Sequence, residues 1–145
     1  VERRGYNFMP YHIIDNLALV QLNNDNTGGL FARIKKEKIQ LINLNIASCI
    51  LNIYLAEKEL AKLIKILQEE GLAYRVTKKL SYIKIRFDQP DKILVDIVDT
   101  VNILRENQIK ILELGLTLNR VYLLIYEKDK ADFIRLFAKY EYRIE

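Results

Sequence analysis

The sequence repeats itself. Residues 38 to 67 align with residues 108 to 137 without a gap, at a constant offset of 70 (109 − 39 = 70). A repeat of this length describes a whole folded unit rather than one turn of a solenoid, so we expect two copies of one small domain. Apolar residues recur at most aligned positions, and the identical pairs are Ile39 with Ile109, Leu44 with Leu114, Glu57 with Glu127, Lys58 with Lys128, Ala61 with Ala131 and Ile64 with Ile134.

Both copies have the same predicted order of elements. In the first copy the spacing of apolar residues predicts helices at about 30–38 and 59–70 and strands at about 17–22, 39–46, 50–55 and 72–76. In the second copy it predicts helices at about 88–104 and around Ile134, and strands at about 80–87, 109–114, 120–126 and near Tyr142.

This order predicts the fold class. Strand, helix, strand, strand, helix, strand is the split βαβ pattern, so we expect an α+β protein built from two tandem ferredoxin-like (βαββαβ) domains. Each domain should contain a four-stranded antiparallel sheet. We expect residues 1–16 to form a leader or linker, residues 17–79 the first domain and residues 80–145 the second.

The predicted sheets have too many apolar residues for a surface that faces water. Two helices would cover one face of each sheet, and the other face should then be polar. The predicted strand at 120–126 instead carries Tyr122, Leu124 and Tyr126 on one face and aliphatic residues on the other. We therefore expect this face to be covered by another sheet or another chain, in a homodimer or higher homo-oligomer formed by sheet packing or edge pairing.

The sequence contains no pattern typical of a catalytic or cofactor site. His12 is the only histidine, so neither copy can form a His–carboxylate dyad, and no Cys or His pair has the spacing of a metal site. Gly28 and Gly29 are not followed by the Gly-Lys-Ser/Thr ending of a phosphate-binding loop. We therefore expect no enzyme activity, no metal and no cofactor.

Charge and hydropathy limit the partners. The net charge of +4 comes from basic residues that alternate with acidic ones, as on solvated helix faces, and it indicates nucleic acid only weakly. No apolar run reaches the roughly 20 residues that span a bilayer, so we expect no membrane partner. The single cysteine, Cys49, cannot form an intramolecular disulfide, which favours the cytoplasm.

One loop could bind a ligand. Residues 23–29 lie between a predicted strand and a predicted helix, so their amides would converge at the positive end of that helix. Gly28 and Gly29 would allow a ligand to approach the backbone closely, and Asp25 would supply a negative charge. Amides for a carboxylate and a carboxylate for an ammonium are what a free amino acid requires. The competing interpretation is a turn capped by its own residues. The matching loop of the second copy, Asp88–Asp91, contains Pro and no Gly, so a ligand would favour the first copy.

The loop and the repeat together resemble the ACT domain, an amino-acid-sensing module of ferredoxin-like fold. The stretch Asn26-Thr27-Gly28-Gly29-Leu30-Phe31-Ala32-Arg33-Ile34 is similar to the segment in which an Asp and a Pro-Gly pair precede the family's first helix. Ile39-Gln40-Leu41 resembles the family's Ile-Asn-Ile strand entry, and Ser48 its strand-end serine. Two copies after a short linker look most like the regulatory region of aspartate kinases, over about residues 14 to 145.

The resemblance implies a regulatory module without a kinase domain. It would sense a small amino acid, such as lysine or threonine, at an inter-domain or inter-subunit interface, and it would control an amino-acid biosynthetic enzyme such as aspartate kinase. By position in the family's pattern, the ligand contacts would be Asp25, Asn26, Thr27, Gly28, Gly29 and Leu30, together with Gln40, Leu41 and Asn43.

Two alternatives stay open. Thr27 stands where the family usually has Pro, and the turn between the two middle strands lacks the usual Gly-Ser, which would suit an interaction or assembly module of the same fold that has lost its ligand. Sheets of this topology also carry RNA, and Tyr82, Tyr122 and Tyr126 could stack on bases. The balanced charge makes nucleic acid the weakest of the three hypotheses.

Overall fold

The computed structural model describes residues 8–87, 93–116 and 120–141. The chain forms two compact units. One consists of Asp15–Leu80 and is called here the continuous unit; the other combines Val1–Ile14 with Ser81–Glu145 and is called the split unit. The helix start predicted at Asp88–Asp91 and the last strand predicted near Tyr142 lie outside the described residues.

The continuous unit contains two helices, a 3-10 turn and strands that pair antiparallel. Strand β3 lies between β1 and β2, with Leu17 opposite Ala56 in one pairing and Asn43 opposite Tyr54 in the other. The elements are the second part of β1 (Phe8–Asn23), η1 (Asn24–Asn26), α1 (Leu30–Lys36), β2 (Asn43–Ala47), β3 (Ile50–Ala56), α2 (Glu57–Glu69) and the first part of β4 (Arg75–Phe87).

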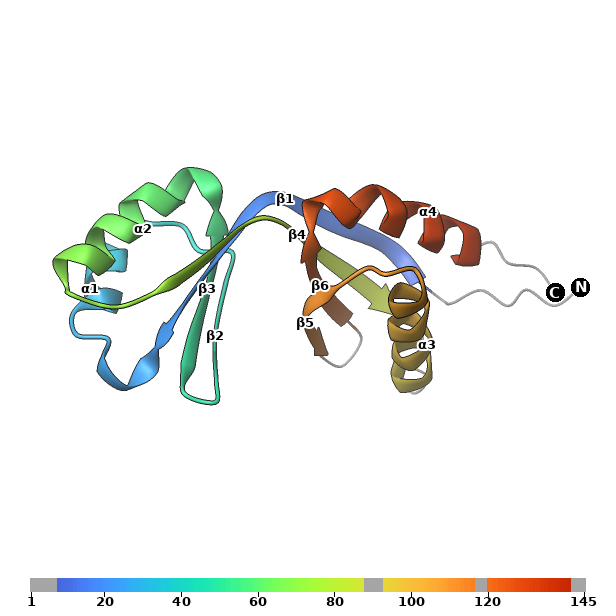
Figure 1. Cartoon of the computed structure of the whole chain (residues 1–145), viewed down its shortest axis with the longest axis horizontal. Helices are drawn as coiled ribbons and strands as arrows, with labels where there is room; N and C mark the ends of the chain where they lie inside the picture. Colours follow the sequence, from blue (N-terminus) through green and yellow to red (C-terminus); the bar gives the residue numbers. More distant parts are fainter. Residues whose placement is uncertain (1–7, 88–92, 117–119, 142–145) are drawn as a thin grey trace, which may run out of the picture. The chain divides into compact units, whose positions relative to one another are not determined.

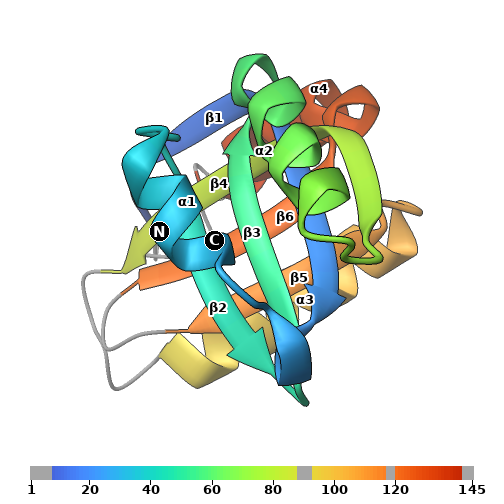
Figure 2. The same cartoon turned by 90° about the vertical axis from the view of Figure 1, so that its left-hand side faces the viewer.

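Both helices of this unit lie on one side of its strands. Figure 2 shows α1 and α2 in front of β3. Leu30 and Ile34 of α1 and Leu63 of α2 enter one core with Val20 of β1 and Ile53 of β3. The apolar spacing of the two helices therefore produces the single core that the sequence predicts for this copy.

The split unit repeats this arrangement. It contains the rest of β1 and β4, and its core joins Ile83 of β4, Leu104 of α3, Leu123 of β6 and Phe133 of α4. Strands β5 and β6 pair antiparallel, with a bulge between Ile111 and Glu113. The other elements are α3 (Ile93–Glu106), β5 (Ile111–Leu116), β6 (Arg120–Tyr126), η3 (Glu127–Asp129) and α4 (Lys130–Glu141).

The structure repeats at the same offset of 70 as the sequence. Strand β3 starts at Ile50 and β6 at Arg120, while α1 ends at Lys36 and α3 at Glu106. After each of these helices one residue takes a left-handed conformation: Lys38 with φ 54° and Gln108 with φ 60°. The next N–H then donates back to the helix, from Ile39 to Ile34 O at 3.1 Å and from Ile109 to Leu104 O at 2.9 Å. Both helices thus end in the same Schellman motif.

These two helix ends give the first prediction. A non-glycine residue in the left-handed region costs roughly 1–2 kcal/mol, and glycine removes that cost while losing some backbone entropy. We expect Lys38→Gly and Gln108→Gly each to raise the free energy of unfolding by about 0.5–1 kcal/mol, measured by urea denaturation.

Gly71 provides the matched control. It ends α2 with φ 68° and open space around its missing Cβ, so Gly71→Ala should lower stability by about 1 kcal/mol through the backbone alone. Equal effects of all three substitutions would contradict this account of the helix ends.

The order of the strands differs from the predicted pair of separate four-stranded sheets. The described strands form one hydrogen-bonded series of six, β2-β3-β1-β4-β6-β5, in a mixed α/β fold with four α-helices. Strands β1 and β4 run side by side, and each contributes residues to both units (Figure 1). Each of these long strands was predicted from the sequence as two separate segments.

The points of division have a physical cause. Asn16 in β1 has φ 53° and Lys79 in β4 has φ 57°, so each strand contains a left-handed residue where the predicted segments 1–16 and 17–79 end. Such residues interrupt the alternation of side chains as bulges do. Residues 8–16, which we expected in a leader or linker, belong to β1. Pro10 hid this part of the strand because proline is unusual inside a sheet.

None of the helices in the described ranges is long and apolar enough to cross a membrane.

Candidate functional site

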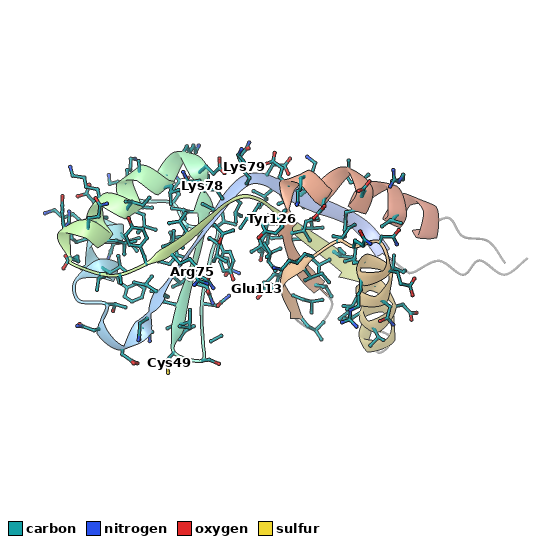
Figure 3. All side chains as sticks on the ribbon, viewed as in Figure 1. Cys49, Arg75, Lys78, Lys79, Glu113 and Tyr126 are labelled. Carbon is teal, nitrogen blue, oxygen red and sulfur yellow. The ribbon has the colours of Figure 1, made fainter. Side chains whose placement is uncertain are left out.

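The predicted ligand loop follows β1 of the continuous unit. Asn23 ends the strand, and its Oδ1 accepts a hydrogen bond of 2.8 Å from the Asp25 N–H. The Asn24 N–H donates to Cys49 O at 2.9 Å, which ties the loop to the turn between β2 and β3 where Cys49 lies (Figure 3). These two bonds fix the start of the loop and leave the Asp25 side chain exposed.

The two glycines complete the approach to α1. Gly28 has φ 54°, a left-handed conformation that favours glycine, and Gly29 is the N-cap of α1 without a side-chain hydrogen bond. The Leu30 N–H donates to Thr27 O at 3.1 Å, so the backbone of Thr27, rather than its hydroxyl, supports the helix start. The Leu30 side chain is fully buried and anchors α1 in the core.

The carboxylate of Glu70, the residue that follows α2, lies beside these glycines. A Cβ added at Gly28 would lie 3.5 Å from Glu70 Oε2, and one added at Gly29 would lie 3.4 Å from Glu70 Oε1. Arg33 of α1 forms an ion pair with Glu69 and lies 3.9 Å from Glu70 Oε1. The hydrogen bond to Glu69, followed by the charges of the acidic neighbours, raises the pKa of Arg33.

Sequence reasoning missed this acidic neighbour. Asp25 is the only acidic residue of the loop itself, and Glu69 and Glu70 follow the glycines by about forty residues and carry no motif. The structure adds Glu70 as a second negative group near the loop. A ligand ammonium could use it, whereas a ligand carboxylate would have to approach the loop amides past it.

The second part of the predicted site follows the other end of α1. Gln40 is exposed, Leu41 packs against the core, and Asn43 begins β2 with its Oδ1 accepting from the Leu44 N–H at 2.8 Å. Helix α1 has seven residues and is therefore about 10 Å long. The segments 25–30 and 40–43 thus flank its two ends, and whether they share one ligand stays a prediction.

A pocket of about 570 Å³ adjoins the loop in the continuous unit. It is lined by Gln21, Leu22 and Asn23 of β1, Ile50 of β3, and residues Ala73, Tyr74 and Arg75. None of the nine predicted ligand residues lines it, although Asn23 precedes them directly. Its volume suits a small molecule, and Arg75 gives it a cation.

A row of polar side chains crosses the strands beside this pocket. Gln21 donates to Asn52 at 3.0 Å, Asn52 donates to Asn45 at 2.8 Å, and Asn45 donates to the Tyr54 hydroxyl at 3.2 Å. Asn52 is 8% exposed and Tyr54 is fully buried. Paired amides of this kind satisfy buried polar atoms and fix the register of β1, β3 and β2.

In the split unit, stacked tyrosine rings occupy the place that corresponds to this row of polar side chains. Asn45 pairs with Asn52 across β2 and β3, and at the offset of 70 Gly115 pairs with Tyr122 across β5 and β6. The Tyr122 ring stacks on Tyr82 with centroids 5.3 Å apart and donates its hydroxyl proton to Glu113 at 3.0 Å. Tyr82 is only 4% exposed, so it offers no face on which a base could stack. This weakens the nucleic-acid hypothesis.

The Tyr122 phenol gives a prediction about pH. Burial, then the hydrogen bond to Glu113, raises the pKa of Tyr122 from 10.0 to about 12. Because the phenol ionises more easily in the unfolded chain, its contribution to stability is complete below pH 10 and is lost between about pH 10 and 12. Between about pH 10 and 12, we expect the urea midpoint of Tyr122→Phe to decrease less than the urea midpoint of the original chain.

Tyr126→Phe is the matched control for this titration. Tyr126 lies on the same strand, and Lys128 lies over its ring at 5.5 Å. If both variants lose stability with pH as steeply as the original chain, the Tyr122 phenol does not contribute to the pH dependence.

Among the described residues, no group of three or more His, Cys, Asp or Glu side chains is arranged to hold a metal ion.

Comparison with known proteins identifies the fold. No protein-family model matches the chain, and no curated protein matches its sequence. The regulatory subunit of aspartate kinase from Thermus thermophilus, in its ligand-free form, matches with 12% identity and a TM-score of 0.71, over 90% of this chain and 95% of that chain. A putative C-terminal regulatory domain of aspartate kinase from Porphyromonas gingivalis matches with 13% identity and a TM-score of 0.68, over 92% and 97%.

A longer enzyme contains the same fold. Aspartokinase III from E. coli, in complex with lysine and aspartate, matches with 12% identity and a TM-score of 0.65, over 92% of this chain and 33% of that chain. All three identities are low, so the likeness concerns the fold. The resemblance to the regulatory region of aspartate kinases that the sequence predicted is confirmed at this level.

Proposed function

We propose that this chain is a non-catalytic, ACT-type regulatory module that binds a small amino acid and controls a biosynthetic enzyme such as aspartate kinase. The observation that carries the proposal is the match to regulatory subunits of aspartate kinase over nearly the whole of both chains. Coupling to an enzyme requires a ligand that binds two arrangements of the module with different affinity.

The strand order of each unit supports the ACT-type assignment. Restricted to the continuous unit, the order is β2-β3-β1-β4, with β1 and β4 as its first and last strands along the chain. Within the split unit the order is β5-β6-β4-β1. Here β1, which comes first in the chain, takes the place that the last strand has in the continuous unit. Both are consistent with the ferredoxin-like order, so we propose two interleaved copies instead of two consecutive ones.

We propose that the amino acid binds at the loop of the continuous unit. Asp25, Asn26, Thr27, Gly28, Gly29 and Leu30 would form one wall, and Gln40, Leu41 and Asn43 would complete the site from the other end of α1 or from a second copy. Asp25 and Glu70 provide negative charge near the loop. This charge favours lysine, with its second ammonium, over threonine.

The proposed assembly is a homodimer or higher homo-oligomer that pairs through β2. This strand is the first in the hydrogen-bonded order and carries Leu44, 40% exposed, and Ile46, 55% exposed. Phe31 on the neighbouring helix α1 is 41% exposed. An edge strand with exposed apolar side chains is a ready surface for a second chain.

One observation favours the alternative of an assembly module without a ligand. The left-handed φ of 54° at Gly28 already favours glycine at that position, whereas a Cβ at Gly29 would make only an ordinary contact with Glu70. Gly28 therefore has a structural explanation that involves no amino acid.

A thermal-shift screen against the twenty amino acids tests the proposal. A ligand at a hundred times its Kd stabilises the folded chain by about 2.7 kcal/mol, which should raise the melting temperature by several degrees. We expect one amino acid to do so, and Asp25→Ala to reduce the shift strongly while leaving the melting temperature of the free protein unchanged. A folded protein that responds to none of the twenty contradicts the sensing role. If the protein also stays oligomeric with both Asp25→Ala and Gly28→Val in place, the assembly module is the better account.

A further inference from the structure

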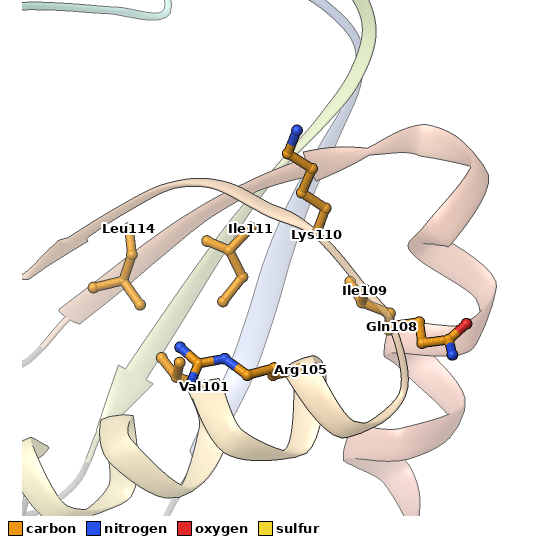
Figure 4. A pocket seen from close by; sticks show the side chains of 7 residues that line it. All are labelled: Val101, Arg105, Gln108, Ile109, Lys110, Ile111 and Leu114. Carbon is orange, nitrogen blue, oxygen red and sulfur yellow. The ribbon is translucent and has the colours of Figure 1, made fainter.

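A second pocket lies in the split unit, between the C-terminal half of α3 and the beginning of β5 (Figure 4). Its volume is about 600 Å³, and its lining includes Val101, Arg105, Ile109, Lys110, Ile111 and Leu114. It contains none of the residues proposed above to bind an amino acid. The volume is in the range of pockets that hold small molecules.

Three aliphatic side chains form the body of this pocket. Val101 comes from α3, and Ile111 and Leu114 come from β5 and point toward the helix (Figure 4). All three are partly buried and pack against the core of the split unit, so the core holds them in place. A surface of this kind accepts a short branched hydrocarbon chain and gains from removing it from water.

Arg105 provides a cation at the pocket. Figure 4 shows its guanidinium beside Val101, on the side of α3 that faces Ile111. In the part of the chain that the structure describes, Arg105 forms no ion pair with a carboxylate, in contrast to Arg33 of the continuous unit, which pairs with Glu69. A guanidinium whose donors are free matches the two oxygens of a carboxylate. Lys110 also lines the pocket, and Figure 4 shows its ammonium extending away from α3.

The pocket is poorly suited to an ammonium group. Among the described residues that line it there is no Asp or Glu, and Gln108 supplies only a neutral amide. The carbonyls that end α3 already accept hydrogen bonds: Ile103 O from Asn107 Nδ2 at 2.8 Å, and Leu104 O from the Ile109 N–H at 2.9 Å. An amino acid bound here would place its ammonium near the Arg105 guanidinium with no carboxylate from the described lining residues, which is unfavourable in both charge and hydrogen bonding.

We propose that this pocket binds a small branched aliphatic carboxylate that lacks an ammonium group, such as a 2-oxo acid. Arg105 binds the carboxylate, and Val101, Ile111 and Leu114 enclose the hydrocarbon chain. The proposal stands apart from the amino-acid site of the continuous unit, in ligand class and in residues. Each can therefore fail without the other.

The test uses two probes of equal size. Isothermal calorimetry of the full chain with 4-methyl-2-oxopentanoate and with leucine compares a carboxylate without and with an ammonium. We expect the oxo acid to bind at least about tenfold more tightly, because leucine brings an uncompensated charge. A third probe, 4-methylpentan-1-ol, lacks the carboxylate and should bind weakly or not at all.

Two matched variants assign the binding to the pocket. Arg105→Gln should weaken the oxo acid about tenfold or more, because a charge-assisted pair is replaced by a neutral one. Lys35 occupies the position of Arg105 at the offset of 70 in the continuous unit, so Lys35→Gln should leave binding unchanged. No heat with the oxo acid at millimolar concentration, equal binding of leucine, or unchanged binding in Arg105→Gln would each overturn the proposal.

Discussion

Deletion of residues 1–14 is expected to unfold the split unit while the continuous unit stays folded. Residues 8–14 belong to β1, and the N-terminal segment Val1–Ile14 groups with Ser81–Glu145. Removing them takes away backbone pairing along β1 and the contact of Ile13 with the core that contains Phe133. Several lost hydrogen bonds and a lost core contact cost about 4 kcal/mol or more, close to the whole stability of a unit of this size.

Hydrogen exchange measured by mass spectrometry gives the amide protection of each unit separately. In the deleted chain we expect amides of β6, such as Leu123 and Ile125, to exchange as in an unfolded chain. Amides of β3, such as Ile53 and Leu55, should stay protected. Equal protection of both strands would show that the segment is the dispensable leader predicted from the sequence.

Two point variants test the packing of this segment without shortening the chain. Ile13 is partly buried against the core, whereas its neighbour His12 is exposed. Ile13→Asp places a charge against that core and should destabilise the split unit by about 2–4 kcal/mol, while His12→Asp should change stability by less than about 0.5 kcal/mol. A similar effect of both variants would contradict the position of β1 in this unit.

Gly115→Ala is expected to give the largest effect of any single methyl group in the described chain. A Cβ at this position would lie 1.9 Å from Tyr122 Cε1 and 2.0 Å from Cζ, far inside contact distance. The Tyr122 ring covers the glycine because the two residues are directly opposite on β5 and β6. The ring would have to move, which would break its stacking on Tyr82 and its hydrogen bond to Glu113. We expect a loss of about 2–4 kcal/mol, measured by urea denaturation.

A double variant tests the cause. With Tyr122→Ala in place, the added methyl group meets no ring, so Gly115→Ala should then cost less than about 1 kcal/mol. The coupling between the two positions should thus exceed about 1 kcal/mol. Additive effects would mean that the glycine is required for its backbone alone.

The internal repeat made most of the fold predictable. The offset of 70 reappears in the starts of β3 and β6 and in the left-handed residues Lys38 and Gln108, because apolar spacing and helix ends are local properties of the sequence. The exchange of strands between units was not predictable in this way. It depends on β1 and β4 continuing past Asn16 and Lys79, and local alternation is interrupted at both residues.

The candidate site was only partly predictable for a similar reason. The turn at Gly28 and Gly29 follows from its composition, and the structure has a left-handed residue there. The approach of Glu70 to the glycines and the position of Arg105 at its pocket depend on contacts between helices and strands that are distant in sequence. Such contacts arise when the elements pack together, and the spacing of residues along the chain does not predict them.

The most direct measurement is an NMR titration of the ¹⁵N-labelled chain with lysine and then with the other amino acids. If the chain senses an amino acid through the loop, the amide resonances of Gly28 and Gly29 will shift in a saturable way, and Asp25→Ala will weaken the response about tenfold or more. The resonances of Arg105 and Ile111 should stay in place, because they report the other pocket. A folded chain in which no amino acid shifts the two glycine resonances would contradict the proposed regulatory function.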